Sequence, residues 1–221
     1  SINFTTLLAA GAADFNGVTI KKSFKDIKNH NPCLTQKLSA DPGVMEYNGR
    51  IYVYGTNDGY LQDSAPGDNV YGKINSLNVM SSDDLVNWFD QGTIDVAGPN
   101  GVAKWAGNSW APTAAHKTIN GKEKFFLYFA NNASGIGVLV ADSPTGPWRD
   151  PLGKLLISRQ TPNSNVEWLF DPAVFVDGDG TGYLYFGGGV PTGQAANPKT
   201  IRAVKLGNDM ISIVGTPVLI D

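Results

Sequence analysis

The sequence predicts an all-β protein, a β-propeller of which this chain supplies about three blades. One phrase recurs three times at intervals of about 60–70 residues, which suits a four-stranded blade with its loops. Short alternations of apolar and polar residues are common, whereas no longer window keeps the period of about 3.6 residues that marks an amphipathic helix. We therefore expect strands joined by tight turns, with no helix longer than a turn or two.

Each copy of the phrase has three parts, namely a dipeptide that ends in proline, a turn with glycine, and an aromatic-rich strand. Glycine turns between runs of aromatic and β-branched residues are typical of hairpins. The dipeptides are Asp41-Pro42, Ala111-Pro112 and Asp171-Pro172, the turns are Asn48-Gly49, Asn120-Gly121 and Asp179-Gly180, and the strands cover 51–54, 125–129 and 183–186.

Four strands are expected in each unit. The units run over about 40–92, 105–154 and 168 to the end, so residues 39–221 form the blades. Residues 1–38 do not match the repeat and are expected to form an N-terminal arm or a closing segment. The fourth strands are expected to carry Trp88 and Trp148, with a third counterpart at 210–214.

Strand direction brings distant residues to one end of the blades. If each first strand begins at the central cleft, each second strand returns to it. The segments 55–58, 131–132 and 187–189 then lie beside the two aspartates, Asp41 and Asp171, and the long loops 55–73 and 187–200 are placed to wall a pocket. In this reading Asn57 and Asn131 are candidate hydrogen-bonding partners of a sugar.

A single Asp-Pro dipeptide usually only starts a strand, with the carboxylate capping nearby backbone N–H groups. Asp41 and Asp171 recur at equivalent positions of a repeat, which makes that explanation weaker. Two carboxylates that enter one cleft suit acid and base chemistry on an acetal bond, because each shifts the pKa of the other. The sequence therefore favours a hydrolytic site at the cleft.

Composition excludes several classes of function. The net charge is −3 and the sequence pI about 5.3, which argues against a nucleic-acid partner or an anionic membrane surface. The early apolar run at 7–13 is far shorter than the roughly 20 residues that span a bilayer. The only cysteine, Cys33, excludes an internal disulfide and a multi-cysteine metal site.

Three blades make an open arc with unpaired strand edges, whereas propellers usually have about four to eight blades. We expect the remaining C-terminal blades of the same protein, on a further segment or chain, to complete the ring.

At this point a family resemblance becomes specific. Its segments are Ser-Ala-Asp-Pro-Gly-Val at 39–44, Trp-Ala-Pro at 110–112, Phe-Asp-Pro-Ala-Val-Phe at 170–175, and the blade-closing stretches 81–88 and 141–148. Together they resemble glycoside hydrolase family 43 over roughly residues 32–221. The resemblance implies a five-bladed β-propeller that hydrolyses arabinose- and xylose-containing plant polysaccharides with inversion.

The resemblance also implies roles for three residues. Asp41 is similar to the general base that activates water, and Asp171 to the aspartate that orients the general acid and raises its pKa. Trp110 is similar to a wall of the sugar subsite. The family's general acid is a glutamate that the spacing places at or beyond residue 221, and Glu167 is the alternative within this chain.

We expect an exo-acting α-L-arabinofuranosidase, a β-xylosidase or both, acting on arabinoxylan or on xylo- and arabino-oligosaccharides. The alternatives are a non-catalytic carbohydrate-binding propeller and an endo-acting arabinanase or xylanase of the same fold. No cofactor is required for the chemistry. The resemblance implies a structural calcium near the propeller axis, for which His116 is a weak candidate ligand, and a secreted or extracellular protein, with a cytoplasmic location as the alternative.

Overall fold

The computed structural model describes residues 32–59 and 70–221. The chain divides into two compact units, 1–36 and 37–221, and the architecture below is that of the second unit. The N-terminal arm predicted for residues 1–38 lies almost wholly outside the described residues, so its role stays a prediction. Within the described ranges, no helix is long and apolar enough to cross a membrane.

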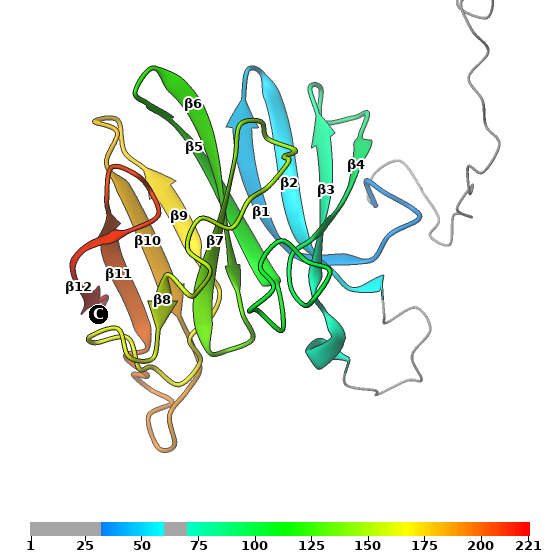
Figure 1. Ribbon diagram of the computed structural model, residues 1–221. Helices are drawn as coiled ribbons and strands as arrows, with labels where there is room; N and C mark the ends of the chain where they lie inside the picture. The colour runs from blue at the N-terminus through cyan, green and yellow to red at the C-terminus, as the bar shows by residue number, and fades with distance from the viewer. Residues whose placement is uncertain (1–31, 60–69) are drawn as a thin grey trace, which may run out of the picture. The chain divides into compact units, whose positions relative to one another are not determined.

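Three four-stranded antiparallel sheets make up the second unit, and in each sheet the strands follow one another in chain order (Figure 1). The first sheet holds β1 (Ser39–Tyr47), β2 (Arg50–Asn57), β3 (Ser76–Ser82) and β4 (Phe89–Asp95). The second holds β5 (Trp110–Ile119), β6 (Lys122–Ala130), β7 (Gly135–Ala141) and β8 (Ile157–Ser158). The third holds β9 (Ala173–Val176), β10 (Gly182–Gly187), β11 (Ile201–Leu206) and β12 (Ile213–Leu219). These sheets are three blades of a β-propeller, as the repeat predicts.

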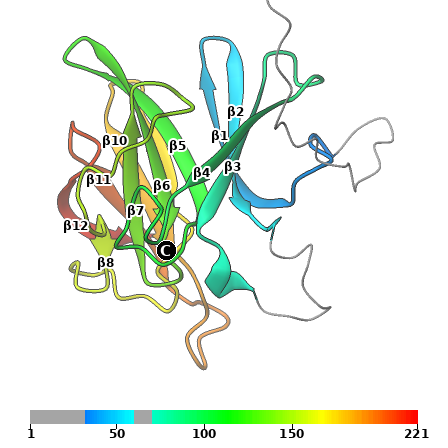
Figure 2. The same cartoon turned by 45° about the vertical axis from the view of Figure 1, so that its right-hand side comes forward.

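The sheets pack face to face, so that the second blade is covered on both sides (Figures 1 and 2). Strand β6 shows this best, because its residues alternate between two cores. Leu127 and its alternate neighbours pack against the first blade, while Phe126 and Tyr128 pack against the third. The continuous aromatic run at 125–129 therefore reflects a strand that is buried on both faces.

Equivalent tyrosines connect each blade to the next. The Tyr54 hydroxyl donates a hydrogen bond of 2.5 Å to the Pro144 carbonyl, and the Tyr128 hydroxyl donates one of 2.6 Å to the Met210 carbonyl. Both carbonyls lie in the turn that follows the third strand of the neighbouring blade. The third counterpart, Tyr185, is 38% exposed on the face of the third sheet that points away from the second blade. The equivalence follows from the register pairs Gly43–Tyr54, Thr113–Tyr128 and Ala173–Tyr185.

The fourth strands differ from the prediction. Trp148 lies outside any strand, because the edge of the second blade is split. Arg149 bridges Val140, the chain then turns away, and pairing resumes only at β8. The turn forms because the Asp150 carboxylate accepts the N–H groups of Leu152 and Gly153. The predicted third counterpart at 210–214 was placed too early, since β12 starts at Ile213.

We predict that Tyr54→Phe lowers the free energy of unfolding by about 1–2 kcal/mol, because the buried Pro144 carbonyl loses its donor. Urea unfolding of the variant and the parent measures the difference. Tyr183→Phe is the matched control, since no described residue accepts a hydrogen bond from the Tyr183 hydroxyl. Equal losses in the two variants would show that the connection between blades contributes nothing specific.

Candidate active site

One pocket of about 550 Å³ receives residues from all three blades. Asp41 from the first blade and Asp171 from the third both line it, together with Trp110 from the second. The predicted convergence of the two aspartates is therefore what the structure shows. The pocket lies where the first strands begin and the second strands end, as the strand directions require.

The backbone at the three entry points shares an unusual conformation. Asp41, Ala111 and Asp171 have φ values of 49°, 41° and 48°, and each directly precedes a proline. A positive φ is uncommon for residues other than glycine, and a residue before proline normally prefers an extended backbone. Strained backbone of this kind persists only where the surrounding structure holds it, and it gathers at functional sites. In the first two blades a break in strand register accompanies it.

A glycine lets the first two blades approach each other beside the pocket. A Cβ atom on Gly43 would lie 2.2 Å from the Pro112 carbonyl oxygen and 2.8 Å from the Thr113 Cα. Because backbone atoms cannot yield as a flexible side chain does, any larger residue would push the two strands apart. The entry points of β1 and β5 stay close only because position 43 carries no side chain.

Thr56 of the first blade contacts both the second blade and Asp41. The side chain is buried, and its Oγ1 accepts the Ala111 N–H at 2.8 Å. Its hydroxyl proton is then directed to the Asp41 Oδ2, at a long 3.5 Å. A donor at this place helps to orient the carboxylate. Sequence reasoning placed 55–58 beside the cleft but did not single out Thr56.

A third carboxylate, that of Asp58, also lines the pocket. Burial raises the pKa of Asp58, and the charge of Asp41 raises it further. The pKa of Asp171 is raised by the same two causes in the same order, although one side of that residue is open to solvent. Both neighbours of Asp41 therefore keep their protons to a higher pH than an isolated carboxylic acid does.

The structure gives Asn57 a different position from the one predicted. Asn57 does not line the pocket. Its Nδ2 donates to the Ser76 Oγ at 2.9 Å, and its Oδ1 accepts the Gly59 N–H at 3.1 Å. The amide is thereby committed to holding the end of β2, and the neighbouring Asp58 faces the pocket instead.

Asn131 likewise supports the loop architecture and is absent from the pocket lining. Its Oδ1 accepts the N–H groups of Gly107 and Asn108, each at 3.0 Å. Those donors belong to the loop that leads into β5, where no strand partner satisfies them. The predicted contact of Asn131 with a sugar has no support in this geometry, because its acceptor is already used.

Aromatic side chains wall the pocket on two sides. Trp110 meets Tyr71 edge to face, with ring centroids 6.2 Å apart, and its Nε1 donates to the Tyr71 carbonyl at 3.2 Å. Trp168 and Phe170, with centroids 5.4 Å apart, form the other wall. Indole and phenyl faces suit the apolar face of a sugar ring. The sequence predicted only Trp110 as a wall, although Phe170 opens the Phe-Asp-Pro phrase and Trp168 lies two residues before it.

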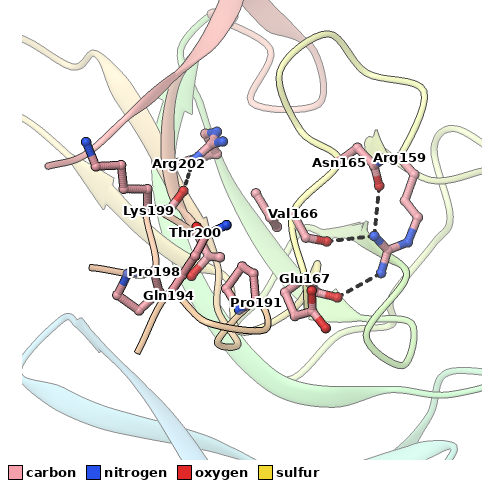
Figure 3. A pocket seen from close by; sticks show the side chains of 10 residues that line it. All are labelled: Arg159, Asn165, Val166, Glu167, Pro191, Gln194, Pro198, Lys199, Thr200 and Arg202. Carbon is pink, nitrogen blue, oxygen red and sulfur yellow. Dashed lines mark hydrogen bonds between the residues drawn. The ribbon is translucent and has the colours of Figure 1, made fainter. Parts of the chain in front are cut away.

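Glu167 lies in a separate groove of about 370 Å³, shown in Figure 3. Arg159 holds this segment by donating to the carbonyls of Val166 and Glu167, at 2.7 and 3.2 Å. Glu167 does not line the pocket of the aspartates, so this geometry gives no support to the alternative that it is the general acid. The loop 187–200 also contributes to this groove, through Pro191 and Gln194, and not to the pocket that it was expected to wall.

Within the described ranges, no three His, Cys, Asp or Glu side chains are grouped so as to hold a metal ion. His116 is hydrogen-bonded to Glu123 and packs edge to face on Tyr47, with centroids 5.1 Å apart. It lies six residues along β5 from the pocket residue Trp110, toward the opposite end of the blade. These residues do not form a calcium site, so the calcium stays a prediction from the resemblance.

We predict that Asp171→Asn raises the free energy of unfolding at pH 7 by less than about 1 kcal/mol, since solvent screens a partly exposed group. The raised pKa means that the folded state disfavours the charged carboxylate. The gain should shrink as the pH falls toward the unfolded-state pKa near 3.8. Thermal unfolding between pH 3.5 and 7 measures it.

Asp84→Asn is the control of opposite sign. Hydrogen bonds from Asn87 and Val86 lower the pKa of Asp84, so its charge stabilises the folded state. The control variant should lose stability at pH 7, and a loss in Asp171→Asn as well would contradict the reasoning.

Comparison with known proteins places the chain in one family. The model of glycosyl hydrolases family 43 matches residues 29–221. An arabinoxylan arabinofuranohydrolase of Bacillus subtilis (strain 168) is 57% identical over 212 residues, covering 89% of this chain and 41% of that protein. One from Paenibacillus polymyxa is 53% identical over 206 residues, covering 87% of this chain and 32% of that protein. The chain therefore spans less than half the length of these relatives.

Solved structures agree with the sequence relatives. A crystal structure of a family 43 arabinoxylan arabinofuranohydrolase from Bacillus subtilis, in complex with cellotetraose, superposes with a TM-score of 0.81 at 55% identity. That match covers 86% of this chain and 42% of the other. An α-L-arabinofuranosidase from Clostridium thermocellum gives a TM-score of 0.64 at 43% identity, over 85% of this chain and 57% of the other. Blades, entry motifs and relatives agree, and the chain belongs to glycoside hydrolase family 43.

Proposed function

We propose that the protein containing this chain is an exo-acting, inverting glycoside hydrolase that removes α-L-arabinofuranosyl groups from arabinoxylan. The observation that carries the proposal is the meeting of Asp41 and Asp171 in one pocket with aromatic walls. The relatives that share more than half of their aligned residues with this chain are named for arabinoxylan arabinofuranohydrolase activity, which supports the substrate class.

Asp41 is the general base in this proposal. It takes a proton from a water molecule as the water oxygen forms a bond to the anomeric carbon, while the bond to the leaving oxygen breaks on the opposite face. The Thr56 hydroxyl directed at Asp41 supports this role, since it helps to orient the carboxylate toward the pocket.

The leaving oxygen needs a proton from a general acid. Inverting hydrolysis places that acid about 6.5–9.5 Å from the base, which leaves room for the water. The sequence has no glutamate after Glu167, which lies outside the pocket, so we assign the acid to a further blade. Asp171, whose pKa is raised by burial and by Asp41, is then placed to orient that acid and to raise its pKa.

β-Xylosidase activity is the second candidate. A xylosidase/arabinosidase of Humicola insolens is 34% identical over 170 residues, covering 71% of this chain and 46% of that protein. Its lower identity supports arabinofuranose as the preferred sugar of this chain. The arabinoxylan arabinofuranohydrolase names of the more similar relatives support exo action over endo action.

The third blade supports the proposal that further blades complete the ring. Its outer face exposes Phe175, Tyr185 and Val218, at 55%, 38% and 57%. On the first two blades, the tyrosine equivalent to Tyr185 donates to a carbonyl of the next blade. We assign to this face a fourth blade that supplies the missing acceptor. Calcium near the axis and an extracellular place of action, which suits a polymeric substrate, stay predictions.

We predict that Asp41→Asn in the full-length enzyme lowers kcat on 4-nitrophenyl α-L-arabinofuranoside by about 10²–10⁴-fold. Nitrophenolate departs without much help from an acid, so this substrate reports on the base. The corresponding β-D-xyloside, assayed in parallel, ranks the two candidate sugars. Asp83→Asn is the control, since its carboxylate is 60% exposed and pairs with Arg50 outside the pocket. Near-normal turnover by Asp41→Asn would remove the base assignment.

Binding of arabinoxylan oligosaccharides without any turnover by the parent enzyme would instead favour the non-catalytic propeller. Calorimetric titration of the full-length protein separates binding from hydrolysis.

We also predict that Tyr185→Phe destabilises the full-length protein by about 1–2 kcal/mol and leaves the 221-residue chain unchanged. The reason is that the acceptor of the Tyr185 hydroxyl lies on the fourth blade. Urea unfolding of both lengths measures the two effects. Tyr54→Phe provides the reference, because its acceptor lies within this chain and its loss should appear in both lengths.

A further inference from the structure

Asp58 stands at the cleft end of β2, directly after its last residue. Its backbone N–H donates to the Leu38 carbonyl at 3.1 Å, which extends the pairing of β1 and β2 by one step. The backbone of Asp58 is therefore held by the blade, and its side chain lines the pocket with Asp41 and Asp171.

No described residue donates a hydrogen bond or forms an ion pair with the Asp58 carboxylate. Asp41, by contrast, has the Thr56 hydroxyl. A structural carboxylate elsewhere in the blades has several hydrogen-bond donors. Asp150, for example, accepts hydrogen bonds from Trp105, Leu152 and Gly153. Asp58 is thus half-buried, close to another carboxylate, and without a donor in the described parts of the chain.

Such an arrangement destabilises a fold, because a desolvated acceptor without a partner costs free energy. The raised pKa of Asp58, caused by burial and then by Asp41, reflects that cost. A half-buried carboxylate without a donor is retained where a bound ligand supplies the hydrogen-bond donor that the protein lacks. Asp58 shares its pocket with the aromatic side chains of Trp110, Trp168 and Phe170, which suit the face of a sugar, and a sugar edge carries hydroxyl donors.

In the proposed mechanism Asp41 is the base, Asp171 orients the acid, and the acid comes from a further blade, so no step at the anomeric carbon is assigned to Asp58. Asp41 has the Thr56 hydroxyl to orient it, and Asp171 has the raised pKa that suits an orienting group. Asp58 is left as an acceptor for a part of the sugar that does not react. A carboxylate accepts hydrogen bonds at two oxygens and so distinguishes hydroxyl positions that a neutral wall cannot.

We propose that Asp58 is a specificity-determining residue that accepts hydrogen bonds from a ring hydroxyl of the terminal sugar in the pocket. This inference rests on the proposed function, in which that sugar is an arabinofuranosyl group. Binding energy from such a contact positions the sugar between the aromatic walls before the bond breaks.

Asp58→Asn in the full-length enzyme tests the inference. We expect kcat/KM on 4-nitrophenyl α-L-arabinofuranoside to fall roughly 10- to 100-fold, as for a lost hydrogen bond to a charged group. The 2-deoxy and 3-deoxy analogues are assayed beside the parent substrate. On one of these analogues the kcat/KM of the parent enzyme should fall by a similar factor relative to the full substrate. The kcat/KM of Asp58→Asn should be almost the same on that analogue as on the full substrate, because the two changes remove the same contact.

Asp95→Asn is the matched control. Asp95 ends β4 on the surface, outside the pocket, and no described residue is bonded to its carboxylate. A merely structural role for Asp58 would lower activity by the same factor on the parent and deoxy substrates, and that result would overturn the inference. Unchanged kcat/KM in Asp58→Asn, or a loss above about 10³-fold in kcat on every substrate, would overturn it as well.

Failure of the proposed function has a different signature. The parent enzyme would then leave the arabinofuranoside uncleaved, and calorimetric titration with methyl α-L-arabinofuranoside decides the inference. Weaker binding by Asp58→Asn than by both the parent and Asp95→Asn would support it. Equal binding by all three proteins, or binding by none of them, would overturn it.

Discussion

The arrangement of the pocket depends on the left-handed backbone at the start of each blade. The residues that adopt it are Asp41, Ala111 and Asp171. None of them is glycine and each precedes proline, and both properties normally disfavour this conformation. The kink interrupts strand pairing at the entry point, and the side chains of Asp41 and Asp171 line the pocket there. Because the same kink occurs in every blade, residues from separate blades share one pocket. Strain at the entry is the cost of that convergence.

Packing of the blades holds these kinks in place. The middle blade is buried on both faces, so neither its register nor its tilt can change without breaking one of two cores. Gly43 removes the side chain that would separate the first two blades, and Thr56 bonds the backbone of the second blade to Asp41 of the first. The pocket is therefore rigid because of contacts between blades, and single strands contribute little by themselves.

Several polar side chains around the pocket are hydrogen-bonded within the fold, whereas two carboxylates inside it are not. The amide oxygens of Asn57 and Asn131 accept hydrogen bonds from N–H groups of loops. The Asp150 carboxylate likewise accepts a loop N–H at the broken edge of the second blade. Asp58 and Asp171 have no such partners among the described residues, and burial with a neighbouring charge raises the pKa of both. The two carboxylates without partners lower the stability of the folded state, and such a loss is typical of a functional site.

The sequence by itself determined the three units, the order of their strands, and the convergence of Asp41 and Asp171. These follow from spacing and strand direction, which are local properties that repeat. Tertiary structure alone decided which neighbouring side chains face the pocket. Asn57 and Asp58 are adjacent, and only the fold shows that the Asn57 amide is bonded to Ser76 and Gly59 while Asp58 lines the pocket. Glu167 sits beside the Phe-Asp-Pro phrase but is held in another groove by backbone contacts to Arg159, which spacing cannot reveal.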